Sequence, residues 1–490
     1  MEVPVYLPSN RNKTPPSSSP CLGDQELLLV KLKNTLIFNA SVSSKLVTWN
    51  QNARHWNGVT CDKDGKVISL DLSFESISCN INSSSSLFRL KHLQKLNLAF
   101  NDFKSSAIPS GFTNLSGLVY LNLSNAGFYG QIPIEIARLR KLMLELSIHD
   151  LSLLYFRGTD TLKLKNPNLK TLIRNLTELR QLHLDGIDLS SEGNERCNAL
   201  SSSVRKLHVL SMSNCFLSGP VDSSLVNLHH LEIPSKIFQV QTLRILDLSG
   251  NQLLQGPLPN FPEDSSLETL VLTYTSISGR LPDSIGNLRK LSRLELSNCR
   301  LSGSILSSME NLSELTYLDL SLNNLTGSVP SFSMSKNLRQ IMLFRNALTG
   351  EIKSTRWAEL LSLVYLDLLY NSPEGSVPPS LFILPSVKII NLSNNQFSGE
   401  LSGSLNVTCY QLTLLDLSSN NLEGPIPAYV FELRGLSYLL LSSNNFSGSL
   451  HIDAFQRLKN LTYLDLSHNG LSINATASTS AMFSFPLYTL

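Results

Sequence analysis

The 490-residue sequence contains no run of about eighteen or more apolar residues, the length that a helix needs to cross a membrane. Its first twenty residues lack the apolar core of a secretory signal and are rich in Pro and Ser. We therefore expect neither a membrane span nor a signal peptide in this chain, and a disordered leader over residues 1–20. Lys and Arg number 40 against 38 Asp and Glu, and no basic stripe occurs, so nucleic-acid binding has no support.

The sequence also lacks the motifs of common enzymes. It has no glycine-rich phosphate loop, no kinase signature and no His or Cys cluster at metal-ligand spacing. His183 and Asp185 share one face of a predicted strand, but no nucleophile accompanies them, and a solvated surface is the simpler interpretation. A recurring Asp in LDL makes an acidic row that we interpret as ordinary surface rather than a cation site. We expect no catalysis, no cofactor and no metal.

What the sequence does contain is a repeat of the form LxxLxLxxNxLxGxxP. Examples begin at Leu243 (LRILDLSGNQLLQGPLP), Leu315 (LTYLDLSLNNLTGSVP) and Leu412 (LTLLDLSSNNLEGPIP). A period of about 24 residues with this leucine pattern indicates an α/β leucine-rich-repeat solenoid, a right-handed superhelix with a parallel concave sheet of plant type. Such a surface suits binding of large ligands. The first apolar residue of LxL marks sixteen predicted strands: Leu70, Leu96, Leu121, Leu144, Leu182, Leu210, Leu246, Leu270, Leu294, Leu318, Ile341, Leu366, Ile390, Leu415, Leu439 and Leu464.

Each residue type that recurs in the repeat has a predicted structural role. The leucines alternate with exposed residues along a strand and fill the core. The asparagine turns inward, so that its amide satisfies buried backbone groups and successive asparagines form a ladder. The glycine of LxG permits a backbone conformation that a Cβ would exclude. The predicted ladder residues are Asn251, Asn323, Asn420, Asn444 and Asn469.

Two steps between strand markers are longer than one period. Leu144 to Leu182 spans 38 residues, and we expect a degenerate turn with a helical back segment near residues 148–179. Leu210 to Leu246 spans 36 residues, as if two return segments near 223–243 followed each other with one strand missing. A natural insertion and a deletion in the gene model would both produce this pattern. Either predicts a local break in the sheet near Leu231–Ile237.

The repeats and the flanking segments give the predicted organisation. Residues 21–66 form an N-terminal cap, residues 67–475 about sixteen repeats in one elongated unit, and residues 476–490 a C-terminal tail with no capping element. Because a terminal repeat needs a polar cover, we expect the chain to be cut short.

Sequons for N-glycosylation occur throughout and favour a secreted surface, although several are by-products of the repeat itself. Asn122 and Asn391 stand in the middle of LxL, where a glycan would block the concave face. The glycosylation candidates are Asn82, Asn114, Asn175, Asn311, Asn324, Asn406, Asn445 and Asn460.

The N-terminal segment resembles a known family. DQELLLVKLKNTL (Asp24–Leu36) and HWNGVTCD (His55–Asp62) are similar to the cap of plant leucine-rich-repeat receptor-like proteins. The repeats over residues 67–103, 112–136 and 163–186 resemble the Verticillium-wilt-resistance subgroup, whose members are cell-surface immune receptors without a kinase. The resemblance covers most of residues 21–475. Members of this family also carry a secretory signal, further repeats, a membrane span and a cytoplasmic tail, none of which we expect in this chain.

The cysteines depart from the family pattern. The family cap carries a Cys pair where this chain has Ala53 and Arg54, which leaves Cys21 and Cys61 as candidates to bond each other. We also consider a bridge between Cys197 and Cys215. The seven cysteines are odd in number, so at least one is unpaired within the chain. We expect Cys79, which replaces a motif glycine, as well as Cys299 and Cys409, to be buried thiols.

Bulky or charged residues at concave positions are the candidate ligand contacts, because aromatic and Arg side chains commonly anchor interfaces. Met342, Phe344 and Arg345, followed one repeat later by Leu369 and Tyr370, are predicted to form a contiguous patch that contacts a protein or peptide. Incidental surface variation is the alternative interpretation. The full set of ligand-contact candidates is Arg180, His183, Asp185, Tyr274, Met342, Phe344, Arg345, Leu369 and Tyr370.

Three functions remain open. The resemblance implies an extracellular recognition module at the cell surface that binds a protein or peptide ligand and signals through a co-receptor or adaptor kinase. A soluble inhibitor of a cell-wall-degrading hydrolase is the second possibility. A non-functional truncated receptor fragment is the third.

Overall fold

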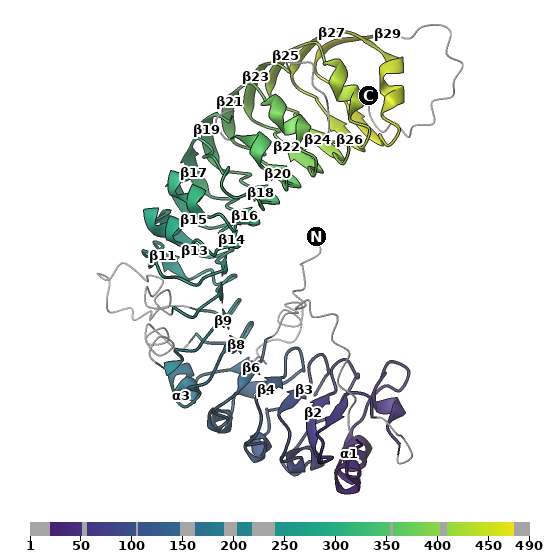
Figure 1. Ribbon diagram of the computed structural model, residues 1–490, viewed down its shortest axis with the longest axis vertical. Helices are drawn as coiled ribbons and strands as arrows, with labels where there is room; N and C mark the ends of the chain where they lie inside the picture. Colours follow the sequence, from purple (N-terminus) through teal and green to yellow (C-terminus); the bar gives the residue numbers. More distant parts are fainter. Residues whose placement is uncertain are drawn as a thin grey trace. The chain divides into compact units, whose positions relative to one another are not determined.

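The computed structural model describes residues 20–50, 56–103, 106–147, 162–190, 203–217, 241–352, 356–401 and 409–474. Contacts between residues divide the chain into two compact units, Met1–Ile187 (unit 1) and Asp188–Leu490 (unit 2). Figure 1 shows the elements of both units, and each unit is described by itself.

Unit 1 begins with a cap in which helix α1 (Gly23–Thr35) and the short 3-10 helix η1 (Leu46–Thr48) precede an antiparallel pair, β1 (Val59–Cys61) with β2 (Val67–Asp71). Cys21 is bonded to Cys61, as predicted, so the start of α1 is tied to β1. From β2 the sheet continues in parallel through β3 (Lys95–Asn97), β4 (Tyr120–Asn122), β6 (Met143–Glu145) and β8 (Gln181–His183). The 3-10 helices η2 (Ser86–Arg89), η3 (Ser110–Asn114) and η4 (Ile134–Arg138) occupy the return segments.

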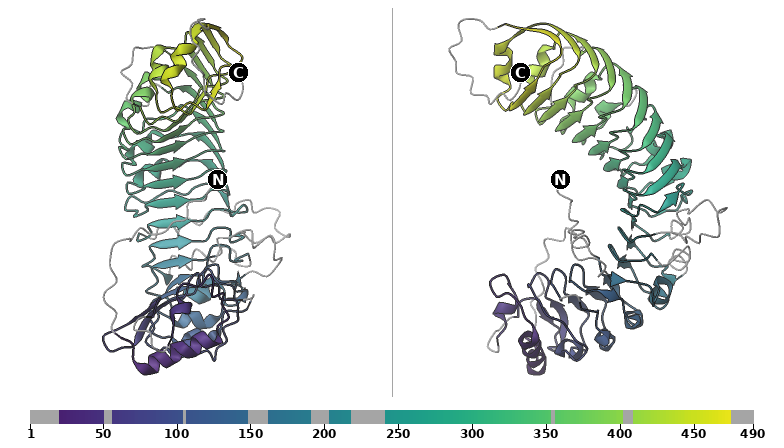
Figure 2. Two further views of the ribbon diagram at one scale, coloured as in Figure 1. Left: turned by 90° about the vertical axis from the view of Figure 1, so that its right-hand side faces the viewer. Right: turned by 180° about the vertical axis from the view of Figure 1, so that it is seen from behind.

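Unit 2 carries two rows of parallel strands. One row lies on the inner side of its arc and pairs leucine with leucine from coil to coil (Figures 1 and 2). Its members are β9 (Val209–Ser211), β10 (Ile245–Asp247), β12 (Thr269–Val271), β14 (Arg293–Glu295), β16 (Tyr317–Asp319), β18 (Gln340–Met342), β20 (Tyr365–Asp367), β22 (Ile389–Asn391), β24 (Leu414–Asp416), β26 (Tyr438–Leu440) and β28 (Tyr463–Asp465).

The second row of unit 2 is built from the LxG segments. It consists of β11 (Gln255–Gly256), β13 (Ser276–Arg280), β15 (Arg300–Ser304), β17 (Asn324–Gly327), β19 (Ala347–Glu351), β21 (Ser372–Gly375), β23 (Gln396–Glu400), β25 (Asn421–Gly424), β27 (Asn445–His451) and β29 (Gly470–Asn474). Gly424 shows why the motif needs glycine: its φ is +74°, and a Cβ there would lie 2.7 Å from Cγ of Glu400.

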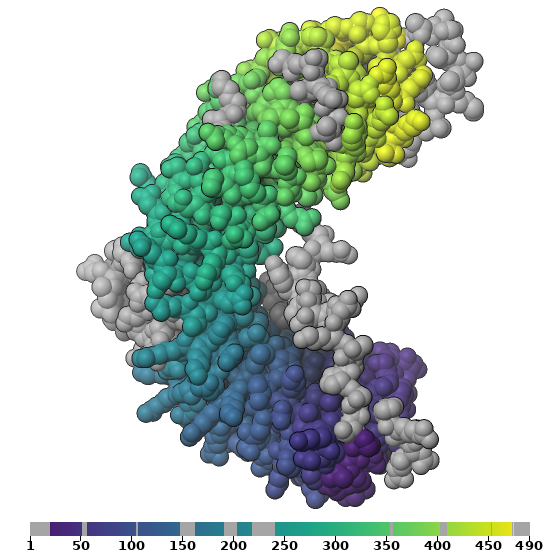
Figure 3. All heavy atoms as spheres, viewed as in Figure 1, coloured from purple at the N-terminus to yellow at the C-terminus, as the bar shows by residue number. Residues whose placement is uncertain are grey.

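Short 3-10 helices complete most coils of unit 2, and the space-filling view shows the coils following one another in sequence order (Figure 3). Their bounds are η6 (Asp283–Asn287), η7 (Ser307–Asn311), η9 (Trp357–Glu359), η10 (Pro379–Ile383), η11 (Ala428–Glu432) and η12 (Ile452–Arg457).

All sixteen predicted strand markers lie in strands of the two inner sheets, and each is buried at 7% exposure or less. The period-two pattern of the strand therefore places one leucine after another in the core, as predicted. The leucine-rich-repeat solenoid is confirmed.

The asparagine ladder is also confirmed. Asn323 is typical: its Nδ2 donates to the carbonyls of Leu296, Leu320 and Ser321 at 2.8–3.0 Å, while its Oδ1 accepts from the backbone N–H of Leu301 at 3.0 Å. Each amide thus joins two coils. Cys299 occupies one ladder position, where its Sγ donates to the carbonyl of Leu272.

The predictions for the two long steps between strand markers have different outcomes. In the first, the described part contains β7 (Leu162–Lys163), which pairs with β5 (Gly130–Gln131), and helix α3 (Leu169–Ile173), so the predicted helical segment is confirmed. In the second, residues 231–237 lie outside the described residues. The flanking strands β9 and β10 nevertheless pair directly in register, with Leu210 opposite Leu246. The predicted break in the inner sheet is therefore wrong, because the edge of β9 finds its hydrogen-bonding partner in the next strand.

Candidate ligand-binding surface

Each coil of unit 2 has four positions on the side of the inner sheet that faces away from the core. In the coil of β16 these are Tyr317, Asp319, Ser321 and Leu322, of which Asp319 and Ser321 are largely covered, at 9% and 1% exposure, while Leu318 and Leu320 lie in the core. Because the strands pair in register, equivalent positions form four columns across the sheet. We name them the first, second, third and strand-end columns, after Tyr317, Asp319, Ser321 and Leu322 respectively.

The second column explains the recurring Asp of the motif. Oδ1 of Asp319 accepts hydrogen bonds from the backbone N–H and the hydroxyl of Ser321, at 3.0 and 2.6 Å. Asn391 makes the same two contacts with Ser393, at 3.1 and 2.7 Å. The side chain thus caps the end of its own strand. An amide serves this purpose as well as a carboxylate.

The structure brings together part of the predicted patch. Arg345 and Tyr370 follow each other in the strand-end column, and the guanidinium lies 5.4 Å from the centroid of the Tyr370 ring. Phe344 and Leu369 stand beside them in the third column, half-buried, while Tyr370 is 49% exposed. We call Phe344, Arg345, Leu369 and Tyr370 the rim patch. It combines a cation with aromatic and aliphatic surface, as interface anchors do.

The other unit 2 candidates are not part of the rim patch. Met342 is half-buried in the second column, between Asp319 and Asp367. Tyr274 occupies the strand-end column three coils before Arg345 and is 54% exposed.

The candidates of unit 1 are only partly accessible. Arg180 is exposed just before β8, and His183 is half-buried opposite Glu145. Asp185 is buried, at 3% exposure, and its Oδ2 accepts from the hydroxyl of Ser147 at 2.6 Å, so its role as a ligand contact stays a prediction. The third-column position packs against the preceding coil, and a short carboxylate there is enclosed.

Sequence reasoning missed a network of acidic and aromatic side chains on β14, β16 and β20. Arg293 is ion-paired with Glu295, and its guanidinium lies 3.8 Å from the Tyr317 ring centroid. Tyr365 donates to Oδ2 of Asp367 at 3.0 Å. The signal was in the sequence, since three coils read Tyr-Leu-Asp (from Tyr317, Tyr365 and Tyr463), but it becomes visible only when the first and second columns are aligned.

Burial controls the ionisation of this network. It raises the pKa of Glu295 in spite of the neighbouring Arg293, and together with Glu295 and Asp319 it raises the pKa of Tyr317 to about 12. Burial, with the charges of Asp416 and Asp319, also raises the pKa of Asp367. The network is therefore a partly desolvated acidic surface, where an added cation gains more than it would in water.

Unit 1 presents a second surface that sequence reasoning missed. Phe74 and Phe100 are 62% and 42% exposed, and their rings stack with centroids 4.2 Å apart. Both have positive φ, near +55°, a region that favours Gly or Asn. The sequence contained a signal for this surface as well, because Phe74 and Phe100 occupy the same position in successive repeats.

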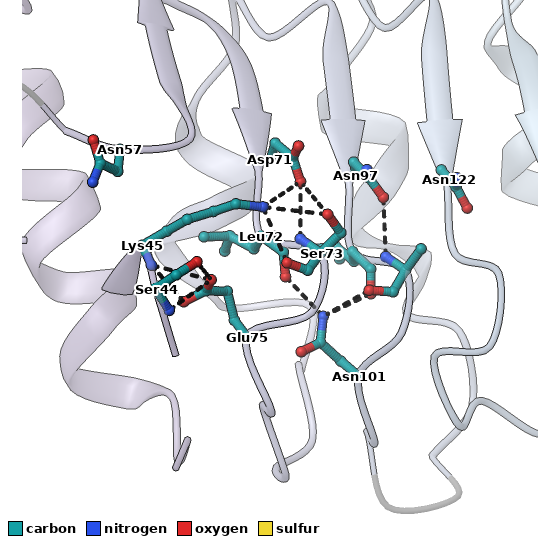
Figure 4. Close-up of polar contacts among 12 residues, drawn as sticks. Ser44, Lys45, Asn57, Asp71, Leu72, Ser73, Glu75, Asn97, Asn101 and Asn122 are labelled. Carbon is teal, nitrogen blue, oxygen red and sulfur yellow. Dashed lines mark hydrogen bonds and ion pairs between the residues drawn. The ribbon is translucent and has the colours of Figure 1, made fainter. Parts of the chain in front are cut away.

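Polar contacts join the cap to the first coil (Figure 4). Glu75 stands where later coils have the ladder asparagine and is fully buried. Its carboxylate accepts from the backbone N–H groups of Ser44, Lys45 and Leu46 at 2.9–3.2 Å, and from the hydroxyl of Ser43. Burial alone would raise the pKa of Glu75, but these hydrogen bonds outweigh it and lower the pKa below its usual value.

Comparison with known proteins agrees with this architecture. The leucine-rich-repeat family profiles match residues 410–471 and, separately, six stretches between residues 92 and 407. Receptor-like protein 6 of Arabidopsis thaliana is 34% identical over 294 residues, and Receptor-like protein Cf-9 of Solanum pimpinellifolium is 32% identical over 291 residues. The chain belongs to the plant leucine-rich-repeat receptor-like proteins. The subgroup suggested by the sequence stays a prediction.

The matches cover 56% and 55% of this receptor-like protein but only 28% and 31% of the two relatives, so the chain spans about a third of their length. Among solved structures, the ectodomain of the Arabidopsis receptor kinase HAESA, in complex with an IDA peptide hormone, has a TM-score of 0.63 at 26% identity. That match covers 91% of this chain and 82% of HAESA's. The complex of PEPR1 with AtPEP1 has a TM-score of 0.52 at 26% identity, covering 92% of this chain and 72% of that one.

Seven of the eight glycosylation candidates of this receptor-like protein lie in the described residues, and all seven are exposed: Asn82, Asn114, Asn175, Asn311, Asn324, Asn445 and Asn460. Asn406 lies outside them. The concave sequon Asn122 differs, because its Nδ2 donates to Glu145 at 2.6 Å and to the hydroxyl of Tyr120 at 3.1 Å.

The remaining cysteines are placed as follows. Cys79 and Cys409 are buried, as predicted, whereas Cys299 is only partly buried. Cys215 is buried at a ladder position, where its N–H donates to Asn251. Cys197 lies outside the described residues, so its bond to Cys215 stays a prediction.

No helix in the described parts of the chain has the length and apolarity to cross a bilayer.

Proposed function

We propose that this chain is the extracellular recognition module of a cell-surface immune receptor-like protein. It binds a peptide or protein ligand on the inner sheet of unit 2 and signals through a partner kinase. The observation that carries the proposal is the rim patch, where Arg345 and Tyr370 form a cation–π pair flanked by Phe344 and Leu369. Most coils present small polar residues at these positions, so the patch is a local departure from the repeat.

The relatives support the ligand class and the partner. The HAESA ectodomain is described in complex with a peptide hormone and with the co-receptor SERK1, and PEPR1 in complex with AtPEP1. Those ligands belong to those proteins. By analogy with these complexes and with the receptor-like proteins, we infer a peptide-like ligand here and a kinase supplied by another chain. The exposed sequons and the Cys21–Cys61 disulfide support an extracellular location.

The test is peptide selection against the secreted full chain, followed by substitution of the rim patch. Peptides from a random displayed library should bind the native chain saturably. The double substitution R345A/Y370A should weaken their binding by at least about tenfold, because hot-spot residues each contribute roughly 1–2 kcal/mol or more.

Tyr410 supplies the matched control. It is 62% exposed in the turn before β24, outside the four columns, so Y410A should leave affinity within about twofold of the native value. Isothermal titration calorimetry measures both. Equal losses for R345A/Y370A and Y410A, or no loss for either, would contradict the assignment of the rim patch.

A further inference from the structure

Two carboxylates on the inner sheet of unit 2 are enclosed by neighbouring side chains without a cation. Asp319 is 9% exposed and Asp367 is 5% exposed. Neither takes part in any ion pair of the described residues. Oδ2 of Asp319, unlike Oδ1, accepts no hydrogen bond from them. Within the same residues, the oxygens of Asp367 accept only from neutral donors, the N–H of Leu369 and the hydroxyl of Tyr365, both at 3.0 Å. A largely buried carboxylate with no opposite charge beside it is unfavourable, so a cation that reaches either one is stabilised.

The two carboxylates flank one thioether. Asp319, Met342 and Asp367 are register neighbours on β16, β18 and β20, which lie side by side (Figure 1). Adjacent strands are about 4.8 Å apart, which places the two Asp Cα atoms roughly 10 Å apart with Met342 between them. Tyr317 and Tyr365 stand next to them in the first column. We call these five residues the acidic–aromatic subsite.

The neighbouring coil shows what such a surface binds. There the guanidinium of Arg293 lies over Tyr317 and is ion-paired with Glu295. Tyr365 and Asp367 repeat the combination of ring and carboxylate. Their first-column neighbours, however, are Gln340 and Ile389, so no equivalent arginine is present. The combination of ring and carboxylate that holds the guanidinium of Arg293 is therefore present a second time, where it can hold the guanidinium of a ligand.

The fold does not need the negative charges. Capping of the strand end uses one oxygen, and Asn97, Asn122 and Asn391 provide it in other coils with the same geometry. A carboxylate at Asp319 and Asp367 therefore adds charge to a position where an amide is sufficient for structure.

We propose that the acidic–aromatic subsite binds the side chain of an arginine in the peptide ligand, which deepens the proposed function and rests on it. A guanidinium offers donors along both edges for the two carboxylates and a flat face for the Tyr365 ring, while the Tyr317 ring already carries Arg293. A metal ion is the weaker fit, because no group of three His, Cys, Asp or Glu in the described residues is placed to hold one.

The experiment is a coupling measurement on the full chain with peptides selected from the random library. D319N/D367N removes the charges and keeps the strand-end caps, as Asn391 does. Arginine should be enriched at one peptide position on the native chain. Exchanging that arginine for citrulline should weaken binding at least tenfold on the native chain and no more than about twofold on D319N/D367N.

The control is D465N, which makes the same change at the same column of β28, where Oδ1 of Asp465 caps its strand through Ser467. It should leave the arginine dependence intact. Selected peptides whose binding is indifferent to the citrulline exchange would overturn the subsite and leave the proposed function standing. A native chain that selects no saturable peptide would overturn both.

Discussion

Replacing Glu75 with alanine should release the cap from the first coil. Backbone N–H groups of Ser44, Lys45 and Leu46 lose their shared acceptor, and η1 loses its anchor. Leaving several buried donors unsatisfied costs about 3–5 kcal/mol in total. Hydrogen exchange of the segment around residues 43–48, followed by mass spectrometry on the full chain, should therefore accelerate by about a hundredfold or more.

The control for this prediction is D71N. Asp71 contacts Lys45 at 2.9 Å, but its side chain is 47% exposed, and such ion pairs contribute about 1 kcal/mol or less. Asparagine also preserves the Oδ1 contact with Ser73, as Asn97 shows for Ala99. Exchange should rise less than about fivefold. A cap that opens equally in D71N and E75A would contradict the role given to Glu75.

The same carboxylate makes the cap sensitive to acid. Its pKa is lowered in the folded chain, so the folded state binds a proton less readily than the unfolded state. The stabilisation is fully present above the ordinary carboxyl pKa and is lost as the pH falls through the lowered one. Exchange around residues 43–48 should consequently accelerate in acid more in the native chain than in E75A, after correction for intrinsic rates.

Removing a ladder asparagine should destabilise unit 2 to a similar degree. Nδ2 of Asn395 donates to the carbonyls of Leu368, Leu392 and Ser393, and its Oδ1 accepts from the N–H of Asn371. N395A removes four hydrogen bonds from these groups, each of which keeps one other partner, at a cost of about 3 kcal/mol in total. Exchange of the backbone N–H of Asn371 should rise by about a hundredfold, because it loses its 3.1 Å hydrogen bond to Asn395 and keeps only the 3.3 Å one to the carbonyl of Asn394.

The neighbouring asparagine is the matched control for N395A. Asn394 has a φ of +54°, a conformation that glycine adopts without strain. N394G should change exchange around residue 371 by less than about threefold. A large effect of N394G, or none of N395A, would show that the ladder does not hold adjacent coils together.

The repeat pattern was sufficient to predict the core, because each motif letter reports a local packing requirement. Leu318 and Asn323 can be placed from one coil alone, since their partners recur at fixed spacing. The pairing of β9 with β10 could not be predicted, because the intervening 36 residues break the period. Which strands are neighbours there depends on the folded path rather than on spacing.

The candidate surface was less predictable, because it depends on relations between coils. Arg345 and Tyr370 stood out by residue type, and the structure places them in contact. Asp185 also stood out but is buried, since the enclosure of a third-column side chain depends on the coil beside it. Asp319 and Asp367 looked like consensus residues. Only their burial, together with the tyrosines of the first column, distinguishes them from the other members of the row.

Photo-cross-linking tests the central claim, recognition on the inner sheet of unit 2, most directly. The photoreactive residue p-benzoylphenylalanine would replace Tyr370 in the rim patch or, in a separate chain, the exposed Tyr410 outside the columns. A selected peptide should cross-link at position 370 and not at position 410, as read by mass spectrometry of the adduct. Cross-linking at position 410 with none at position 370 would contradict binding on the inner sheet.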